Sequence, residues 1–247
     1  ELLDLVGKNF SITNEKLDRI DQFLECLEDN NVFNNLDEIL SWLEMIKKNL
    51  DAKVKQINLS DVDENWLHDE KTGDLVHSTG GYFKVIGVDT RTSIRESGKG
   101  WSQPMIDQGT EASVVGLLCK EFDNIRHYLV EAKFEPGNYD KVILSPTLQV
   151  TYDNLKKMHS GRKPHFSEYF HEIDPESDIN VHFEHWYPED GGRFYLKRVK
   201  NMLVRVGSNH EFKIPDNFIW VTMYQLKMLL KRDNLINPHL RSIISYL

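Results

Sequence analysis

The residues best suited to chemistry lie between Glu131 and Tyr152, in the stretch EAKFEPGNYDKVILSPTLQVTY. Apolar and polar residues roughly alternate on both sides of the EPGNYD turn, and this period of two predicts a pair of antiparallel strands. Lys133 and Glu135 share a face of the first strand, and three polar residues share a face of the second: Thr147, Gln149 and Thr151. So much polar chemistry on one sheet face exceeds what a half-buried sheet needs and favours a polar binding site.

Two cations, Lys133 and Arg193, stand among apolar and aromatic residues with glycine or proline nearby, and we place both in a pocket. The alternative is an ordinary ion pair, for example with Glu131 or Glu135. Four aromatic rings offer flat faces to a nucleobase or a sugar, although such rings are also common in protein cores: Trp66, Tyr82, Trp101 and Tyr195. Of these, the tryptophan directly before Ser-Gln-Pro is the one most expected to contact a ligand.

Common catalytic signatures are absent from the sequence. The two Gly-Gly pairs lack the strand–loop–helix context of a phosphate-binding loop, and no G-x-S-x-G elbow occurs. In the run HFEH, only His182 and Glu184 would face the same way on a strand, and two ligands are too few for a metal site. We therefore expect no metal ion, and we interpret these histidines as structural or exposed. Cys26 and Cys119 provide neither a disulfide framework nor a zinc-binding spacing.

Apolar residues at helical spacing predict two helices near the start of the chain, over 13–29, with Thr13 as the N-cap, and over 36–50. We expect these helices to pair as a hairpin with acidic outer faces. The hairpin would form an appendage of residues 1–52 that serves packing or dimerisation, and a protein-docking arm is the alternative interpretation.

The rest of the chain is predicted to be mostly extended. Strand patterns cover 82–90, 101–107, 112–120, 179–187, 192–199 and 202–206. Residues 153–175 are predicted to form a polar loop with a short helix, and 221–231 and 239–246 to form helices. Strands with helices at both ends define an α+β domain, which we assign to residues 53–247.

The composition is that of a soluble globular protein, with 247 residues, 28% charged and 40% hydrophobic. A net charge of −9 argues against a general nucleic-acid surface. No apolar run approaches the length that spans a membrane, and no signal peptide is recognisable, so we expect a cytoplasmic protein without a membrane or nucleic-acid partner.

The blocks EAKFEPGN and LSPTLQ resemble the sugar-nucleotide 2,3-dehydratases of deoxysugar biosynthesis. Similar blocks recur in the same order at WSQPMIDQ, DGGRFY and RDNLINPHLRSIISYL, so the resemblance spans about residues 66–247. It implies a Nudix-like α+β fold, a mixed sheet flanked by helices, here without the clustered glutamates of Nudix hydrolases. Familiar members are about twice as long and carry two such units, so a homodimer is expected to supply the missing neighbour.

The resemblance also implies a reaction, the loss of water across C2 and C3 of a nucleotide-linked 4-keto-6-deoxy sugar, usually a dTDP sugar. The ketone acidifies the C3 proton, a base removes it, an acid assists the C2 hydroxyl, and donors stabilise the enolate. No redox cofactor or metal is chemically required. The base or acid candidates are Glu131, Glu135, Tyr82, Tyr195 and His159, and the candidate donors to developing charge are Lys133 and Gln149.

The resemblance assigns substrate binding to a second set of residues, with Arg193 suited to a diphosphate because its planar group donates two hydrogen bonds at once. The other members of the set are Trp66, Trp101, Gln103, Ser145, Thr147 and Gln149. The product would be an unstable 3,4-diketo-2,6-dideoxy sugar, so a separate ketoreductase is the expected pathway partner.

Three alternative functions stay open from sequence. A non-catalytic sugar-nucleotide-binding or regulatory module would bind the sugar without eliminating water. A metal-dependent nucleotide-sugar hydrolase would use His182, Glu184 and acidic neighbours, and would lose activity with a chelator. A scaffold organised by the N-terminal helices would bind no nucleotide at all.

Overall fold

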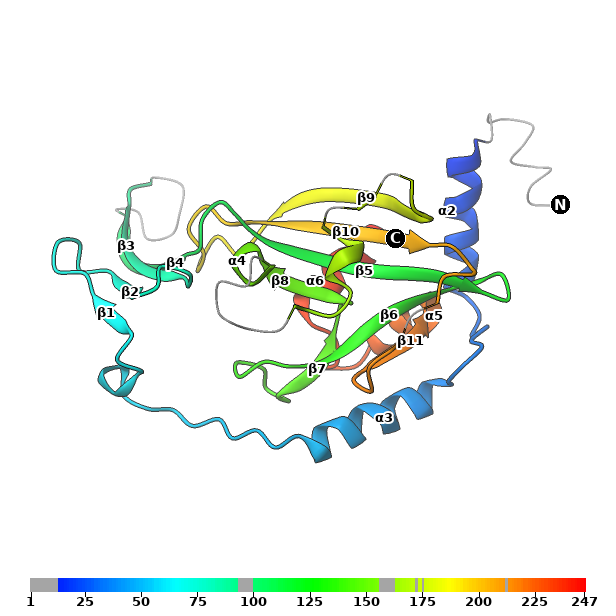
Figure 1. The fold of residues 1–247 in the computed structure, drawn as a ribbon, viewed down its shortest axis with the longest axis horizontal. Helices are drawn as coiled ribbons and strands as arrows, with labels where there is room; N and C mark the ends of the chain where they lie inside the picture. Colours follow the sequence, from blue (N-terminus) through cyan, green and yellow to red (C-terminus); the bar gives the residue numbers. More distant parts are fainter. Residues whose placement is uncertain (1–12, 93–99, 156–162, 172, 175, 212) are drawn as a thin grey trace.

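The structure is a computed structural model that describes residues 13–92, 100–155, 163–171, 173–174, 176–211 and 213–247. With the labels of Figure 1, the helices are α2 (Asn14–Glu25), α3 (Leu36–Asn49), α4 (Tyr152–Leu155), α5 (Met223–Leu229) and α6 (Pro238–Ile244). The strands are β1 (Trp66–His68), β2 (Leu75–His77), β3 (Lys84–Thr90), β4 (Trp101–Asp107), β5 (Glu111–Phe122), β6 (Ile125–Phe134), β7 (Val142–Ser145), β8 (Leu148–Thr151), β9 (Ile179–Pro188), β10 (Arg198–Val206) and β11 (Phe218–Thr222).

The strands form two sheets. A four-stranded sheet runs β1-β2-β3-β4, and a seven-stranded sheet runs β11-β6-β5-β10-β9, with β7 added to β6 and β8 added to β5. Within the described strands, β5 and β10 are parallel and the other pairs are antiparallel. The small sheet lies at one end of the molecule and α2 at the other (Figure 1). Mixed sheets with flanking helices are the α+β class that the sequence predicts.

The large sheet opens into a fork at its centre. β5 and β6 pair with each other from Leu118 opposite Leu129 to their connecting turn. Toward their other ends they separate, where β8 pairs with β5 and β7 pairs with β6. We call this opening the fork. One arm is β6–β7, the other arm is β5–β8, and the short link from β7 to β8 forms its vertex.

The vertex corrects the prediction of one continuous second strand in the hairpin. The strand is interrupted at Pro146 because proline has no N–H to donate to a ladder. Thr147 then joins the two arms with its hydroxyl, which accepts from the Leu118 N–H at 2.8 Å and donates to the Leu129 carbonyl at 2.5 Å. As a result, the polar residues of the hairpin lie on two diverging arms rather than on one flat sheet face.

Apolar cores fill both faces of the large sheet. On one face, β5 and β6 pack against α3, α5 and α6 through fully buried residues such as Leu117, Val130 and Leu226. On the other face, the segment 166–170 packs against β5, β6 and β10. Gly116 is required there, since a Cβ on it would come within 2.3 Å of the Phe170 ring.

The predicted helix over 36–50 is confirmed as α3. It begins with a capping box, in which the Asn35 side chain accepts from the Glu38 N–H and the Glu38 carboxylate accepts from the Asn35 N–H. Ile39 and Leu43 have no exposed surface and belong to the core of the large sheet. This helix shares the core of the strands that follow it, while a domain boundary at residue 52 stays a prediction.

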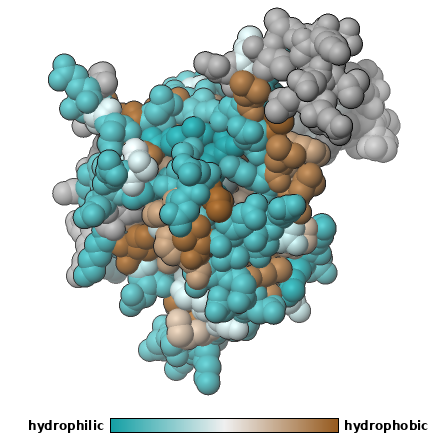
Figure 2. Space-filling view, turned by 90° about the vertical axis from the view of Figure 1, so that its right-hand side faces the viewer, coloured by the Kyte–Doolittle hydropathy of each residue, from teal (hydrophilic) through white to brown (hydrophobic). Residues whose placement is uncertain are grey.

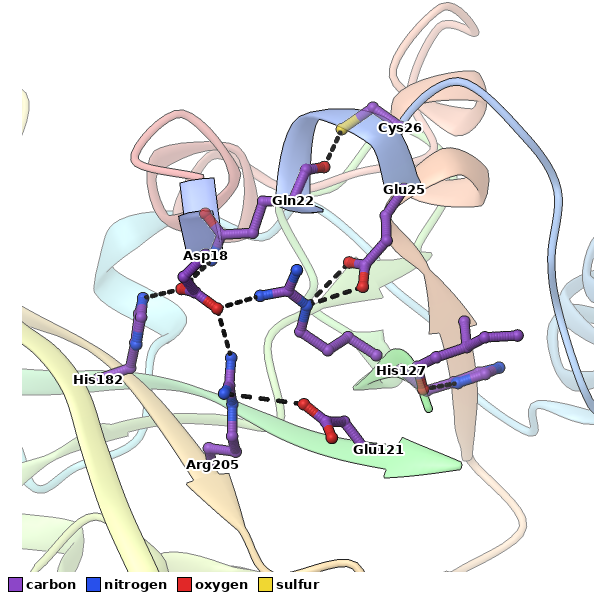
Figure 3. A network of polar contacts seen from close by, with 10 residues as sticks. Asp18, Gln22, Glu25, Cys26, Glu121, His127, His182 and Arg205 are labelled. Carbon is purple, nitrogen blue, oxygen red and sulfur yellow. Dashed lines mark hydrogen bonds and ion pairs between the residues drawn. The ribbon is translucent and has the colours of Figure 1, made fainter. Parts of the chain in front are cut away.

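The predicted helix over 13–29 is confirmed as α2, which ends at Glu25. Asp21 is exposed, as predicted for an acidic outer face, but Asp18 and Glu25 point inward, which corrects the prediction for these two residues. Asp18 accepts from Arg126 at 2.7 Å and Glu25 accepts from the same guanidinium at 2.8 Å (Figure 3). Phe23 is 63% exposed and Leu27 is 57% exposed. Figure 2 faces this end of the molecule and shows apolar patches among the polar surface. Buried arginine, rather than apolar contact, determines which side of α2 faces the sheet.

Two further predictions need correction. The predicted helix over 221–231 is the end of β11 followed by α5, because Thr222 caps the helix in a second capping box with Gln225. The strands predicted over 192–199 and 202–206 are one strand, β10, and residues 192–197 precede it as turns and irregular structure.

Candidate functional site

Lys133 connects the two arms of the fork. Its Nζ donates to the Gln149 carbonyl on the facing arm at 3.2 Å, and lies 3.6 Å from Glu131 Oε2 on its own strand. An ammonium group carries three N–H donors. The lysine therefore keeps donor capacity for a ligand, in a position where 23% of its side chain is exposed.

Glu135 accepts one amide hydrogen bond on each of its carboxylate oxygens. Its Oε1 accepts from Gln149 Nε2 at 2.9 Å and its Oε2 accepts from Asn138 Nδ2 at 3.2 Å. Gln149 Oε1 in turn accepts from Asn237 Nδ2 at 2.8 Å, and the same amide donates to Ser145 Oγ at 2.8 Å. This chain of contacts orients the amides across the fork. The Glu135 carboxylate is therefore suited to holding the Gln149 and Asn138 side chains in place.

Glu131 is the carboxyl group in the fork with the clearest acid character. Its Oε1 accepts from Asn217 Nδ2 at 3.2 Å, and its side chain is 20% exposed. Burial raises the pKa of Glu131 by more than the neighbouring Lys133 lowers it. A carboxyl group that holds its proton to a higher pH than an exposed glutamate is suited to general acid catalysis.

Three further titratable groups are linked electrostatically to the fork, and residue types and spacing did not single them out: Glu189, Lys197 and His239. Lys197 Nζ lies 3.5 Å from Glu189 Oε2, with 8% and 18% of the two side chains exposed. Burial lowers the pKa of Lys197 despite this partner. The charges that act on the partly buried His239 come from this ion pair and from Lys133 and Glu135. The blocks DGGRFY and RDNLINPHLRSIISYL adjoin or contain these residues, and that was the available signal.

Two predicted binding residues are buried inside the protein, where they hold the shape of the fork. Ser145 has no exposed surface and Thr147 is 2% exposed. The Thr147 hydroxyl is committed to backbone groups of β5 and β6, and the Ser145 hydroxyl accepts from Asn237. Their assignment to substrate binding stays a prediction, and their observed contacts are structural.

The aromatic candidates near the start of the small sheet form a cluster of their own, away from the fork. The Trp66 ring lies 5.3 Å from His77 and 5.9 Å from Tyr82, and His77 lies 4.1 Å from Tyr82, all between ring centroids. Tyr82 is 44% exposed. An exposed cluster of rings can stack on a planar ligand.

The remaining candidates lie where β4 meets the segment 190–195. Trp101 Nε1 donates to Gln103 Oε1 at 3.0 Å, and Gln103 Nε2 donates to the Gly192 carbonyl at 2.9 Å. Arg193 pairs with Asp190 and is largely exposed. Gln103 and Arg193 both line a cavity of about 460 Å³ at this place. Another cavity, of about 510 Å³, lies beside α2. Tyr195, 39% exposed, follows on this segment.

Several predicted residues do not contribute to the fork as the structure describes it. His159 lies outside the described residues. Within the described ranges, no group of three His, Cys, Asp or Glu side chains is placed to hold a metal ion. His182 instead lies 3.7 Å from Asp18, and Glu184 accepts from Lys200 at 2.7 Å. No helix among the described residues is both long and apolar enough to span a membrane.

Comparison with known sequences gives consistent matches. The profile of a family described as NDP-hexose 2,3-dehydratase matches residues 36–247. A dTDP-4-dehydro-6-deoxy-alpha-D-glucopyranose 2,3-dehydratase from Amycolatopsis orientalis is 34% identical over 85% of this chain and 44% of its own length. An enzyme of the same name from Saccharopolyspora spinosa is 36% identical over 73% of this chain and 36% of its own length. The chain thus spans less than half the length of these curated relatives.

Comparison with solved structures gives Nudix hydrolases and related enzymes at low similarity. An Ap4A hydrolase from C. elegans has a TM-score of 0.34 at 14% identity, covering 56% of this chain and 97% of its own. An ADP compounds hydrolase has a TM-score of 0.36 at 9% identity, covering 79% of this chain and 94% of its own.

Proposed function

The chain belongs to the NDP-hexose 2,3-dehydratase family, and we propose on this basis that it removes water across C2 and C3 of a dTDP-linked 4-keto-6-deoxyhexose. The observation that carries the proposal is the family match over residues 36–247, which contains every residue of the fork. The product would be a 3,4-diketo-2,6-dideoxy sugar. We place the chemistry in the fork, where charged groups converge, rather than at the exposed aromatic rings.

The substrate's own ketone determines what the protein must supply. Removal of the C3 proton leaves an enolate whose negative charge rests on the C4 oxygen, so a cation or hydrogen-bond donor is needed there. We assign this role to Lys133, which reaches across the fork and has N–H groups beyond the one that contacts the Gln149 carbonyl. Gln149 and Glu135 hold the facing arm in position.

The departure of the C2 hydroxyl needs a proton, because hydroxide is a poor leaving group. Glu131 is our candidate for the general acid, since burial raises the pKa of its carboxyl group. A neighbouring lysine would usually keep a glutamate ionised, but here the effect of burial is larger. Lys133 and Glu131 would thus act on the C4 oxygen and the C2 hydroxyl, one on each side of the reacting C3.

We propose that the nucleotide part lies toward the small sheet. Arg193, Gln103 and Trp101 adjoin the cavity at β4, and an arginine can donate two hydrogen bonds at once to a diphosphate. Trp66, Tyr82 and Tyr195 would then provide flat faces for the base or the sugar. In this arrangement the tyrosines bind and do not transfer protons.

We propose that the protein acts as a homodimer. The chain spans 44% of its relative from Amycolatopsis orientalis, and a second copy in a homodimer would supply a comparable length of chain. A ketoreductase that consumes the reactive diketone is the expected pathway partner, and a cytoplasmic location stays a prediction.

The test follows the sugar by proton NMR. The purified protein would be mixed with dTDP-4-keto-6-deoxyglucose in deuterated water, with a parallel tube containing a 3-ketoreductase and reduced nicotinamide. A trapped 2-deoxy sugar is the expected product. Tight binding without any change in the sugar would instead favour a regulatory module, and release of a nucleotide that a chelator prevents would favour a hydrolase.

A further inference from the structure

The first turn of α6 lies over the fork. Asn237, the N-cap of this helix, donates through one side-chain amide to Ser145 Oγ and to Gln149 Oε1, both at 2.8 Å. Its backbone N–H donates to the Leu144 carbonyl on β7 at 2.9 Å. The helix start is thereby fixed against both arms of the fork, and His239 follows two residues later.

His239 has an unusual combination of burial and free hydrogen-bonding capacity. Its side chain makes no hydrogen bond or ion pair with any residue that the structure describes. Yet four charged groups act on it electrostatically: Lys133 on β6, Glu135 just after that strand, and Glu189 and Lys197 from the β9–β10 connection. A histidine that is only structural usually spends its ring nitrogens on fixed partners.

The protonation state of His239 suits a base. Burial lowers the pKa of its imidazole, and the two lysines act in the same direction, while Glu189 and Glu135 oppose the shift. The ring is therefore mostly neutral at pH 7, with a lone pair available. The obvious competitor, Glu135, accepts an amide hydrogen bond on each carboxylate oxygen, whereas the ring nitrogens of His239 have no such donors among the described residues.

We propose that His239 is the general base that removes the C3 proton of the sugar, an inference that rests on the proposed dehydratase function. A ring nitrogen takes the proton from C3, and the C–H electron pair forms a C3=C4 double bond as negative charge moves to the C4 oxygen beside Lys133. The enolate electrons then return to form C2=C3 as the C2 hydroxyl leaves with a proton from Glu131, as water. Transfer of the C3 hydroxyl proton to Glu131, and of the imidazolium proton to C2, gives the diketone and restores both groups.

The Glu189–Lys197 pair has a supporting part in this scheme. Its two side chains are largely buried, and both act on the histidine ring electrostatically. Glu189 would stabilise the imidazolium formed in the step, whereas burial, helped by Lys197, favours the neutral resting imidazole. The pair would thus tune the base electrostatically.

The test measures deuterium exchange at C3 and dehydration separately, for the wild type, His239→Asn and His239→Gln, in deuterated water with dTDP-4-keto-6-deoxyglucose. We expect both rates to fall by about 100-fold or more in both variants, with dTDP affinity changed less than about threefold. Exogenous imidazole is expected to restore part of the exchange rate in His239→Ala. His182→Asn is the matched control, since burial also lowers the pKa of this histidine but its neighbours are Asp18, Arg205 and Arg126.

The outcomes separate the two proposals. An active wild type with a His239→Asn variant that still exchanges C3 at the wild-type rate would overturn the role of His239 and leave the dehydratase assignment intact. A wild type that neither exchanges nor eliminates would overturn both. If the variants fail to fold, as judged by circular dichroism, the wild-type pH profile decides. As the pH is lowered, the rate of C3 exchange must fall with an apparent pKa below the ordinary histidine value of about 6.5. An exchange rate that does not fall in this pH range would contradict the proposal.

Discussion

Two clusters of charges in the described part of the molecule, one at α2 and one in the fork, differ in how completely their groups are paired. At α2, Arg126 is 5% exposed and contacts both Asp18 and Glu25 within 3 Å, while Arg205 lies 3.5 Å from Asp18 (Figure 3). In the fork, Lys133 approaches Glu131 only to 3.6 Å and His239 has no hydrogen-bonding partner among the described residues. Saturated pairing identifies a structural cluster, and spare donors and acceptors identify a site.

The strongest test of the structural cluster is Arg126→Met. This change leaves Asp18 and Glu25 without the guanidinium they share, and breaking such a buried pair should lower the free energy of unfolding by about 3 kcal/mol. Urea denaturation followed by circular dichroism measures the change. The folded fraction should retain the wild-type kcat, and a loss of kcat without a loss of stability would place function at α2.

The matching test in the fork is Lys133→Met, which keeps the length of the side chain and removes its charge. If the ammonium stabilises the enolate, kcat should fall by about 100- to 1000-fold. The unfolding free energy should change by less than about 1 kcal/mol, because the ion pair with Glu131 is long and partly exposed. Lys84→Met, at the exposed first residue of β3, serves as the control variant. A Lys133→Met enzyme with normal kcat would remove the fork from the mechanism.

Thr147→Val tests whether the vertex maintains the fork. The variant preserves side-chain shape but leaves the Leu118 N–H and the Leu129 carbonyl without their bridging hydroxyl, at a cost of about 1 to 3 kcal/mol. Thermal unfolding should show the loss, and Thr147→Ser should recover most of it. Equal stability of the valine and serine variants would show that the hydroxyl does not join the arms.

Glu131→Gln has the smallest expected effect on stability, and its sign is informative. Since the folded-state pKa of Glu131 is raised, the folded protein binds the proton more tightly than the unfolded chain. The wild type therefore loses stability relative to the always-neutral glutamine variant as the pH rises above the ordinary value of 4.5. Unfolding curves at pH 5 and pH 8 should show this gain for the variant, below about 1 kcal/mol, together with a lower kcat.

Sequence reasoning found the part of the fork that lies within one hairpin. Lys133, Glu135 and Gln149 do come together, because alternation along a strand determines which side chains share a face. It missed the divergence of the arms, because the consequence of Pro146 depends on how β5 and β6 separate. Asn237 and His239 arrive from a helix far along the chain, and no local period indicates such a meeting.

The same limit explains the error at α2. Helical spacing correctly predicted the helix, but the expected orientation assumed that apolar residues face the protein. Arg126 on β6 draws the carboxylates of α2 inward, because leaving a buried guanidinium unpaired costs more free energy than exposing Phe23 and Leu27. The position of a buried cation depends on the tertiary structure, and residue periodicity does not predict it.

A crystal structure with a bound inert substrate analogue tests the central claim most directly. The analogue is dTDP-4-keto-2,6-dideoxyglucose, which lacks the C2 hydroxyl and cannot lose water across C2 and C3. If the fork is the active site, the C4 oxygen of the analogue will lie within hydrogen-bonding distance of Lys133 Nζ, with C3 beside the His239 ring. A sugar ring bound at α2, or anywhere outside the fork, would contradict this claim.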